Sequence, residues 1–158
     1  MPKSTSKMIE EFKAFITFVN SLNSIDEEYW NKPLSEGKWS MKDVISHIML
    51  WDKYYYEGAI QKIKHGEALT VKHLNYDEFN AKARDYAKSQ SKDKIIDQFI
   101  EYREKIIADI TELTEEEYTK KYKNGDKRVF TIRGYVRSFS LHDKGHGKQI
   151  KEYLKTIE

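Results

Sequence analysis

Three of the five histidines in this chain are placed where they could build a metal-binding site. His142 and His146 are four residues apart, which is about one helical turn, so both imidazoles project from one face of a helix. His47 lies in a second segment of helical character. If the fold brings His47 to that face, three nitrogen ligands leave one coordination position open, which is typical of a catalytic metal site rather than a structural one.

The spacing of the last segment places two of these histidines on its apolar stripe. Steps of three and four residues lead from Phe139 to His142, His146 and Ile150. Burying two imidazoles costs free energy unless each finds a partner, and a shared metal ion would satisfy both while holding them neutral. The alternative is that each histidine pairs with a tyrosine or a carboxylate, and the chain has eleven Tyr.

Two carboxylates and two glycines flank the histidines. Asp143 follows His142 by one residue, roughly 100° around a helix, so we expect it to face outwards or towards a neighbouring helix. Asp52 is also off the histidine face, and for both residues a solvated or salt-bridged carboxylate is favoured over a hydrogen-bond partner of a metal ligand. Gly145 and Gly147 either allow another helix or a ligand to come close, or mark a frayed helix.

The other aromatic and histidine side chains near these segments are expected to have structural roles. Trp39 and Trp51 are predicted to be core anchors. One or two of the consecutive residues Tyr54–Tyr56 must face the core, and packing is favoured over proton donation. His65 and His73 stand in a polar connection and are expected to be exposed.

Composition limits the fold and the partners. A length of 158 residues suits one domain over residues 1–158, and seven Gly with two Pro favour a helical protein. Charged residues make up 34% of the chain but balance to +2, which gives no electrostatic case for a nucleic-acid or membrane partner. The chain has no Cys, so disulfides are excluded and any metal must be held by nitrogen and oxygen ligands. Since no signal-peptide-like or membrane-spanning apolar run is found, we expect a cytoplasmic protein.

Hydrophobic periodicity predicts helices along most of the chain. Ser4 or Ser6 is the candidate N-cap of the first helix, and Thr114 with Glu117 forms a capping box that opens a single turn. Asn124-Gly125 marks a loop or a short hairpin. The predicted helices cover residues 5–23, 40–65 and 77–88, a stripe from Ile95 to Leu113, and residues 131–155.

Two segments about 95 residues apart carry a family resemblance. GKWSMKDVISHIMLWD and FSLHDKGHGKQIKEYL resemble the DinB/YfiT-like superfamily, which pairs W-S-x-x-[DE]-V-x-x-H-x-x-x-W-[DE] on the second helix with H-x-x-x-H-x-x-Q on the last. The middle of the chain, LNYDEFNAKARDYAKSQSKDKIIDQFIEYREKIIADITELTEEEY, is similar to the ClbS/DfsB branch. The resemblance covers nearly the whole chain, and the order and separation of the motifs make it specific.

The resemblance implies an all-α protein: an up-up-down-down four-helix bundle with short extra helical turns in its connections. The metal triad of the family falls on His47, His142 and His146, around a divalent ion that is usually zinc or nickel, and often in a homodimer. Some members are transferases or isomerases that use mycothiol or bacillithiol. ClbS-like members instead protect against a reactive genotoxic metabolite by opening its cyclopropane ring, and they commonly lack the full triad that this chain keeps.

Two classes of function fit these features. The first is a metal-dependent enzyme that hydrolyses a small reactive or electrophilic molecule or transfers a thiol to it; a low-molecular-weight thiol would then be a cofactor, because the chain has no Cys. The second is a non-catalytic bundle that binds or sequesters a small molecule, as a ClbS/DfsB-like protein would in resistance or detoxification. A third possibility is a pseudoenzyme whose metal site is vestigial. The expected partners are a small-molecule substrate and a second copy of the chain, with no nucleic acid and no membrane.

Overall fold

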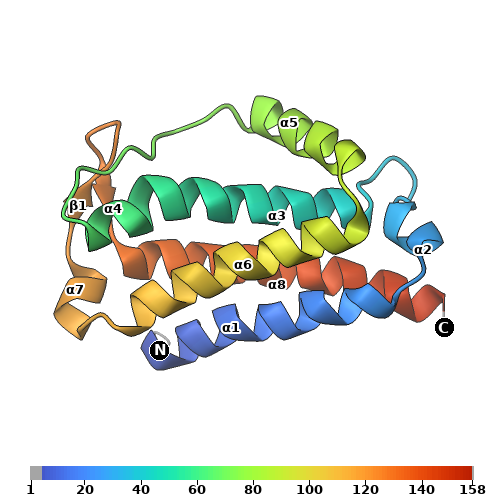
Figure 1. Ribbon diagram of the computed structural model, residues 1–158, viewed down its shortest axis with the longest axis horizontal. Coiled ribbons are helices and arrows are strands. Elements are labelled where there is room, and N and C mark those ends of the chain that lie inside the picture. The colour runs from blue at the N-terminus through green and yellow to red at the C-terminus, as the bar shows by residue number, and fades with distance from the viewer. Residues whose placement is uncertain (1–4, 158) are drawn as a thin grey trace.

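Four long helices form the body of the protein in the computed structural model, which describes residues 5–157 (Figure 1). Side-chain oxygens of Ser40, Asn75, Ser91 and Thr131 each accept a hydrogen bond from a backbone N–H in the first turn of the helix that follows. In chain order the elements are α1 (Thr5–Ser21), the 3-10 turn η1 (Leu22–Ser24), α2 (Glu27–Asn31), α3 (Met41–Tyr55), the π-helical turn η2 (Tyr56–Ile60), α4 (Gln61–Lys64), α5 (Tyr76–Ser89), α6 (Lys92–Thr111), α7 (Glu115–Thr119), β1 (Tyr122–Lys123), β2 (Val129–Phe130) and α8 (Ile132–Thr156).

The directions of the four long helices follow from which ends share a hydrophobic cluster. Met8 near the start of α1 packs in one cluster with Ile132 at the start of α8, so these two helices are parallel. Val44 near the start of α3 packs in another cluster with Ile95 near the start of α6, together with Leu22 just after α1. The four-helix bundle is therefore confirmed, and along the chain α1, α3, α6 and α8 run up, down, down, up rather than in the expected order up, up, down, down (Figure 1).

The connections explain this order. Residues 22–40 form a short link closed by an antiparallel bridge between Pro33 and Ser40, so α3 returns antiparallel to α1. A parallel α6 needs a long crossover, which is supplied by residues 65–75 and by α5, lying over α3 (Figure 1). A two-stranded hairpin around Asn124-Gly125, as predicted, leads into α8.

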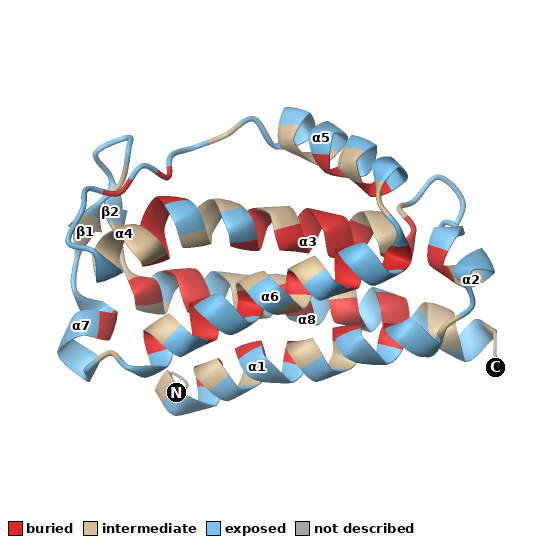
Figure 2. Cartoon of the chain, in the orientation of Figure 1, coloured by how far each residue is buried: buried red, intermediate tan, exposed pale blue. Residues whose placement is uncertain are grey.

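Buried side chains line the inner faces of the helices (Figure 2). A small satellite cluster of Ala59, Leu69 and Val71 fixes the crossover segment against η2. Gly58 in η2 has no room for a side chain, because a Cβ there would lie 2.7 Å from Val71 Cγ1, and its carbonyl accepts a 2.9 Å hydrogen bond from the Thr70 N–H. The π-helical turn therefore anchors the start of the crossover, whose helix α5 forms one wall of a cavity.

The predicted helices agree with the observed ones to within a few residues. The helix expected over residues 40–65 is one continuous rod of α3, η2 and α4. Ser40 and Thr114 both open helices through capping boxes, with Asp43 and Glu117 as the reciprocal partners. Ser4 lies outside the described residues, and Ser6, the other candidate cap, lies inside α1.

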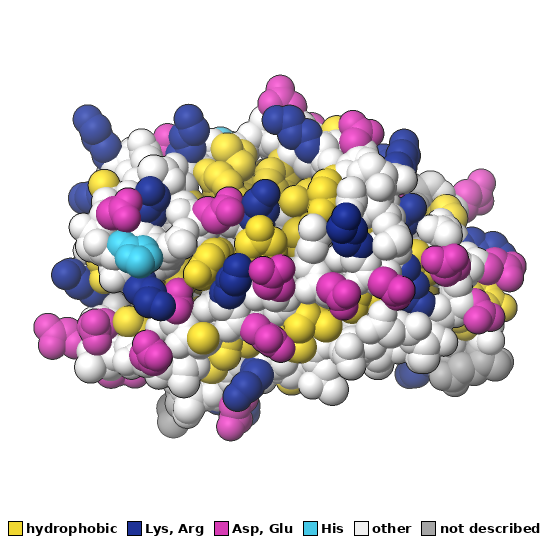
Figure 3. All heavy atoms as spheres, in the orientation of Figure 1, with side chains coloured by type: hydrophobic (Ala, Val, Ile, Leu, Met, Phe, Trp, Pro, Cys, Tyr) yellow, Lys and Arg dark blue, Asp and Glu magenta, His cyan; other side chains and the backbone are white. Residues whose placement is uncertain are grey.

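The surface is consistent with the balanced composition. Figure 3 shows acidic and basic side chains interspersed over one face, with hydrophobic side chains visible between them. Within the described part of the chain, no helix has the length and apolarity needed to cross a membrane.

Candidate metal centre

His47 on α3 and the His142/His146 pair on α8 meet between the two helices. The Nε2 atom of His142 lies 3.2 Å from Nε2 of His47 and 3.1 Å from Nε2 of His146. Nitrogens bound to zinc at 2.0–2.1 Å in tetrahedral geometry lie about 3.3 Å apart, so these spacings are those of a three-nitrogen site. It is the one cluster of three or more potential metal-ligating side chains among residues 5–157.

All three imidazoles are held neutral by their surroundings. Burial, followed by the charges of His142 and His146, lowers the pKa of His47 to about 3, although Asn80 acts in the opposite direction. Burial and the neighbouring His146 lower the pKa of His142 to about 4, and burial also lowers the pKa of His146. Neutral rings are the form that binds a metal ion.

Hydrogen bonding orients one ring and leaves the other two unsatisfied. His146 Nδ1 lies 3.2 Å from Gln149 Oε1, so Nδ1–H donates to the amide oxygen and the Nε2 lone pair is directed at His142. The Nδ1 atoms of His47 and His142 and the Oδ1 atom of Asn80 are buried and make no hydrogen bond of standard geometry, although Asn80 lies close enough to His47 to raise its pKa.

The cluster fits a divalent transition metal. Each ring nitrogen of a neutral imidazole is either a donor or an acceptor, so Nε2 of His142 cannot satisfy both of the Nε2 atoms that approach it. A cation that accepts three lone pairs resolves this conflict. The donor set, which holds nitrogen and no thiolate, suits a transition-metal ion rather than calcium or magnesium.

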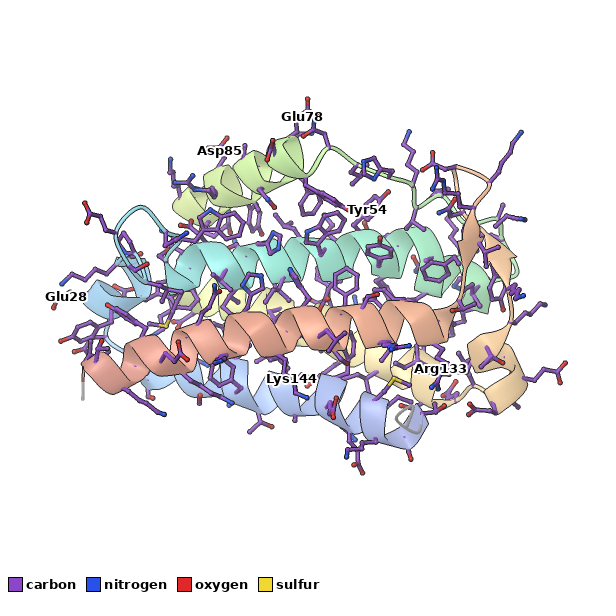
Figure 4. All side chains as sticks on the ribbon, turned by 180° about the vertical axis from the view of Figure 1, so that it is seen from behind. Glu28, Tyr54, Glu78, Asp85, Arg133 and Lys144 are labelled. Atoms are coloured by element: carbon purple, nitrogen blue, oxygen red, sulfur yellow. The ribbon has the colours of Figure 1, made fainter. Side chains whose placement is uncertain are left out.

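The histidines lie at one part of a cavity of about 850 Å³ between α3, α5, the β hairpin and α8. Figure 4 shows α3 and α8 from this side, with Tyr54 lying between α3 and the crossover that carries α5. Trp39, Trp51 and Tyr55 line the cavity, and Trp51 stacks on Phe79 with ring centroids 3.9 Å apart. Trp51 is buried, as expected of a core anchor, whereas Trp39 is only half-buried. Both tryptophans also line the cavity, which the sequence-based prediction did not include.

A second buried polar cluster joins the same two helices to α6. Arg103 of α6 donates from Nε to Asp52 Oδ2 at 2.8 Å and from Nη1 to Asp143 Oδ2 at 2.7 Å. Its Nη1 also donates to the Phe12 carbonyl, and its guanidinium lies over the Phe12 ring. The sequence-based preference for salt-bridged carboxylates at Asp52 and Asp143 is therefore confirmed.

Arg103 connects the two helices that carry the histidines. Asp52 follows His47 by five residues on α3, and Asp143 directly follows His142 on α8, so the guanidinium pairs with one carboxylate from each of these helices. Burial lowers the pKa of Arg103, but the two carboxylates outweigh it and raise that pKa overall. Burial raises the pKa of Asp52 to about 6 against the opposing effect of Arg103.

Arg103 is the functional-region residue that sequence reasoning missed. It stands four residues after Phe99 and three before Ile106, on the buried stripe of α6. An arginine in that register is a signal for a buried ion pair, since Arg is almost never buried without a partner.

The two glycines and the two remaining histidines also have clear positions. α8 runs unbroken through Gly145 and Gly147, so the helix does not fray there. A Cβ on Gly147 would lie 3.3 Å from Phe15 Cε1 of α1, whereas a Cβ on Gly145 would meet nothing within 4 Å. Close approach of a helix therefore applies to Gly147 only. His65 and His73 are exposed, as expected.

The chain belongs to the DinB superfamily, because the model of that family matches residues 16–150. Among solved structures it is similar to YfiT from Bacillus subtilis, described as a probable metal-dependent hydrolase with an unusual four-helix bundle topology. The identity is 14% over 99% of this chain and 93% of YfiT, with a TM-score of 0.78. No curated protein matches the chain.

Two further structures have the same fold. A mycothiol-dependent maleylpyruvate isomerase is 12% identical over 93% of this chain, with a TM-score of 0.71, and this chain spans 60% of its length. The colibactin self-resistance protein ClbS, in complex with double-stranded DNA, is 16% identical over 98% of both chains, with a TM-score of 0.72. At these identities the likeness establishes the fold.

The ClbS complex corrects one expectation. The balanced charge of this chain led to the prediction that nucleic acid is not a partner, and that prediction is wrong, because a protein with this fold is crystallised with double-stranded DNA. Net charge averages over the whole surface and says nothing about a local face, so a value near neutrality does not exclude such a partner.

Proposed function

We propose that this protein is a metal-dependent enzyme that acts on a small electrophilic or otherwise reactive molecule. The observation that carries the proposal is the convergence of three neutral imidazole nitrogens, 3.1 and 3.2 Å apart, in the wall of a cavity of about 850 Å³. His47, His142 and His146 would hold a divalent cation, with zinc or nickel favoured by the all-nitrogen donor set.

Each neighbouring residue has a defined task in this proposal. A divalent cation in the site supplies Lewis acidity, which polarises a carbonyl or epoxide or makes a thiol more acidic. Gln149 holds His146 in the tautomer with a free Nε2. The rings of Trp39 and Trp51 pack against His47, with centroid distances of 5.0 and 6.4 Å, and form the cavity wall beside it.

The proposal includes two reactions, hydrolysis and thiol transfer. A thiol transfer needs a low-molecular-weight thiol from solution, since the chain has no Cys. Related folds include both a probable metal-dependent hydrolase and a mycothiol-dependent isomerase, and this is why both reactions are kept.

One observation favours a second candidate, a non-catalytic protein that binds or sequesters a small molecule. None of the described residues that line the cavity is an aspartate or a glutamate, so the wall offers no carboxylate as a general base. A site that only binds its ligand needs none.

Metal content is the direct test of the proposed site. Full-length protein loaded with zinc or nickel and then dialysed is expected to retain stoichiometric metal, measured by mass spectrometry of the element. His47→Ala and His142→Ala are each expected to weaken the metal affinity at least about tenfold, because a ligand is lost. His73→Ala is the matched control, since His73 is exposed and lies outside the cluster. Wild-type protein that retains no more metal than the ligand variants would contradict the proposal.

Activity separates the two candidates. The metal-loaded protein is assayed with nitrophenyl acetate for hydrolysis, and with chlorodinitrobenzene plus cysteine or glutathione for thiol transfer. The enzyme proposal predicts turnover that is lost in His142→Ala and kept in His73→Ala. Metal binding and ligand binding without turnover of any such substrate would favour the sequestering protein.

A further inference from the structure

The walls of the cavity at the histidine cluster are aromatic and carry no charge. Seven of the lining residues are Trp, Tyr or Phe, and none is Lys, Arg, Asp or Glu, although 34% of the chain is charged. These aromatic residues are Trp39, Trp51, Tyr55, Tyr76, Phe130, Tyr135 and Phe139. An anionic group placed among them would lose its hydration without gaining a partner, so the walls select against negative charge.

The cavity is elongated, and its metal-binding end is distinct from the rest. Its lining follows α8 from Thr131 at the N-cap to His146, which corresponds to about 22 Å along the helix. His142 and His146 lie at one end of this line, and Asn80, whose buried Oδ1 has no partner, lies on the α5 wall. The remaining length offers mainly ring surfaces.

Exposed apolar surface is concentrated at the same cavity. Three large hydrophobic side chains stand out as exposed in the described chain: Tyr76 at 59%, Val129 at 56% and Leu141 at 59%. Tyr76 of α5 and Val129 of β2 line the cavity, whereas Leu141 does not. Apolar side chains exposed together at the rim of a pocket indicate a ligand that covers them.

From these features we infer that the ligand of this site has a flat, aromatic or conjugated body without negative charge and carries its polar reactive group at the end that faces the histidines. The inference rests on the proposed metal-dependent function and specifies its substrate class. The ring surfaces bind the body through apolar burial and stacking, while the metal end fixes its orientation.

A series of hydroxamic acids with one metal-binding head and different bodies tests the inference on the zinc-loaded full chain. Acetohydroxamic, benzohydroxamic and naphthohydroxamic acid are expected to bind with rising affinity, by about tenfold for each added ring. A carboxylate on the far side of the benzene ring is expected to weaken binding by at least about tenfold. Equal affinity across the series, or tightest binding of the carboxylate, would overturn the inference.

Substitutions of exposed hydrophobic residues test whether the aromatic body of the ligand binds at the rim of the cavity. Tyr76→Ala is expected to weaken naphthohydroxamic acid several-fold and to leave acetohydroxamic acid unchanged, because only the larger body reaches the rim. Leu141→Ala is the matched control, an equally exposed hydrophobic residue outside the cavity, and is expected to alter neither. An identical loss in both variants would contradict the assignment.

A probe without a metal-binding head keeps this inference distinguishable from the proposed function. Naphthol is titrated into metal-free protein, and binding is followed through the fluorescence of the cavity tryptophans. If the protein holds no metal but binds naphthol with the same dependence on Tyr76, the aromatic ligand class stands and the metal-dependent function fails. If metal binds and naphthol does not, the inference on the ligand body is overturned.

Discussion

The histidine cluster and the Arg103 cluster are two buried polar groups that both include side chains of α3 and α8, and they are built in opposite ways. Around Arg103, the guanidinium donates to both Asp52 and Asp143, so the charges pair within the protein. Around His142, three Nε2 atoms face one another, and the Nδ1 atoms of His47 and His142 have no partner. The charged groups of the Arg103 cluster are all paired within the protein, whereas the histidine cluster keeps ring nitrogens that no protein group satisfies.

The difference follows from what lies next to each cluster. Arg103 is fully buried and its guanidinium lies over the rings of Phe12, Phe15 and Phe99, so nothing from solution can reach it. The histidines border a cavity of about 850 Å³. A closed cluster can hold α3 and α8 together, and an open one of the same size can bind something that the chain lacks.

Among the changes that test this comparison, replacing Arg103 with Met is expected to have the largest effect on the free energy of unfolding. The substitution leaves Asp52 and Asp143 buried without their cation, and breaking a buried ion pair by removing one partner costs about 3–5 kcal/mol. The measurement is the free energy of unfolding in urea for metal-free protein at neutral pH.

A triple variant shows whether the loss comes from unpaired charge. Adding Asp52→Asn and Asp143→Asn to Arg103→Met removes both carboxylates, and we expect it to restore part of the lost stability. If Arg103→Met were within about 1 kcal/mol of the wild type, the Arg103 cluster would not be what holds the helices together.

Acidification is expected to lower the stability of the metal-free protein mainly through the histidine cluster. An unfolded histidine takes up a proton near its ordinary pKa of 6.5, whereas burial keeps the pKa of folded His47 at about 3 and that of His142 at about 4. Between these values the unfolded state binds more protons, so stability falls as the pH falls, by about 2 kcal/mol per histidine at pH 5.

The control for this prediction is a His47→Asn/His142→Asn variant, compared with the wild type in metal-free buffer at pH 7 and pH 5. Asp52, whose pKa burial raises to about 6, shifts stability in the opposite sense as the pH falls, but it is present in both proteins and largely cancels in the difference. A wild type that loses no more stability than the variant would show that the histidines are not buried as neutral rings.

The histidine cluster could be anticipated from sequence, and the Arg103 cluster could not. The four-residue spacing of His142 and His146 on an apolar stripe predicted a shared face, and the motif around His47 identified its partner helix. Asp52, Asp143 and Arg103 lie on three different helices, so only the packing of those helices brings them together. Residue spacing within one helix predicts which side chains share a face of that helix, but it does not predict contacts between different helices.

The same distinction holds for the fold. Capping residues and periodicity located the helices, because these signals are local. The direction of α3 relative to α1, and of α6 relative to α3, depends on how the links at residues 22–40 and 65–91 cross the bundle. Trp39 was predicted to be a core anchor for the same reason: its spacing favours burial, and the cavity it lines is formed by residues distant in sequence.

The smallest expected effect concerns the two glycines beside the open cluster, which stand in one helix but face different surroundings. Alanine is favoured over glycine in a helix interior by about 1 kcal/mol, and a Cβ on Gly145 would meet nothing within 4 Å, so we expect Gly145→Ala to stabilise the protein by up to that amount. At Gly147 the new Cβ would lie 3.3 Å from Phe15 Cε1, and Phe15 is itself packed against Phe99, so the neighbouring ring has little freedom to move. The crowding offsets the helical gain, and Gly147→Ala is expected to be less stable than Gly145→Ala, as measured by thermal unfolding of metal-free protein. The reverse order would mean that α1 and α8 are not in close contact beside Gly147.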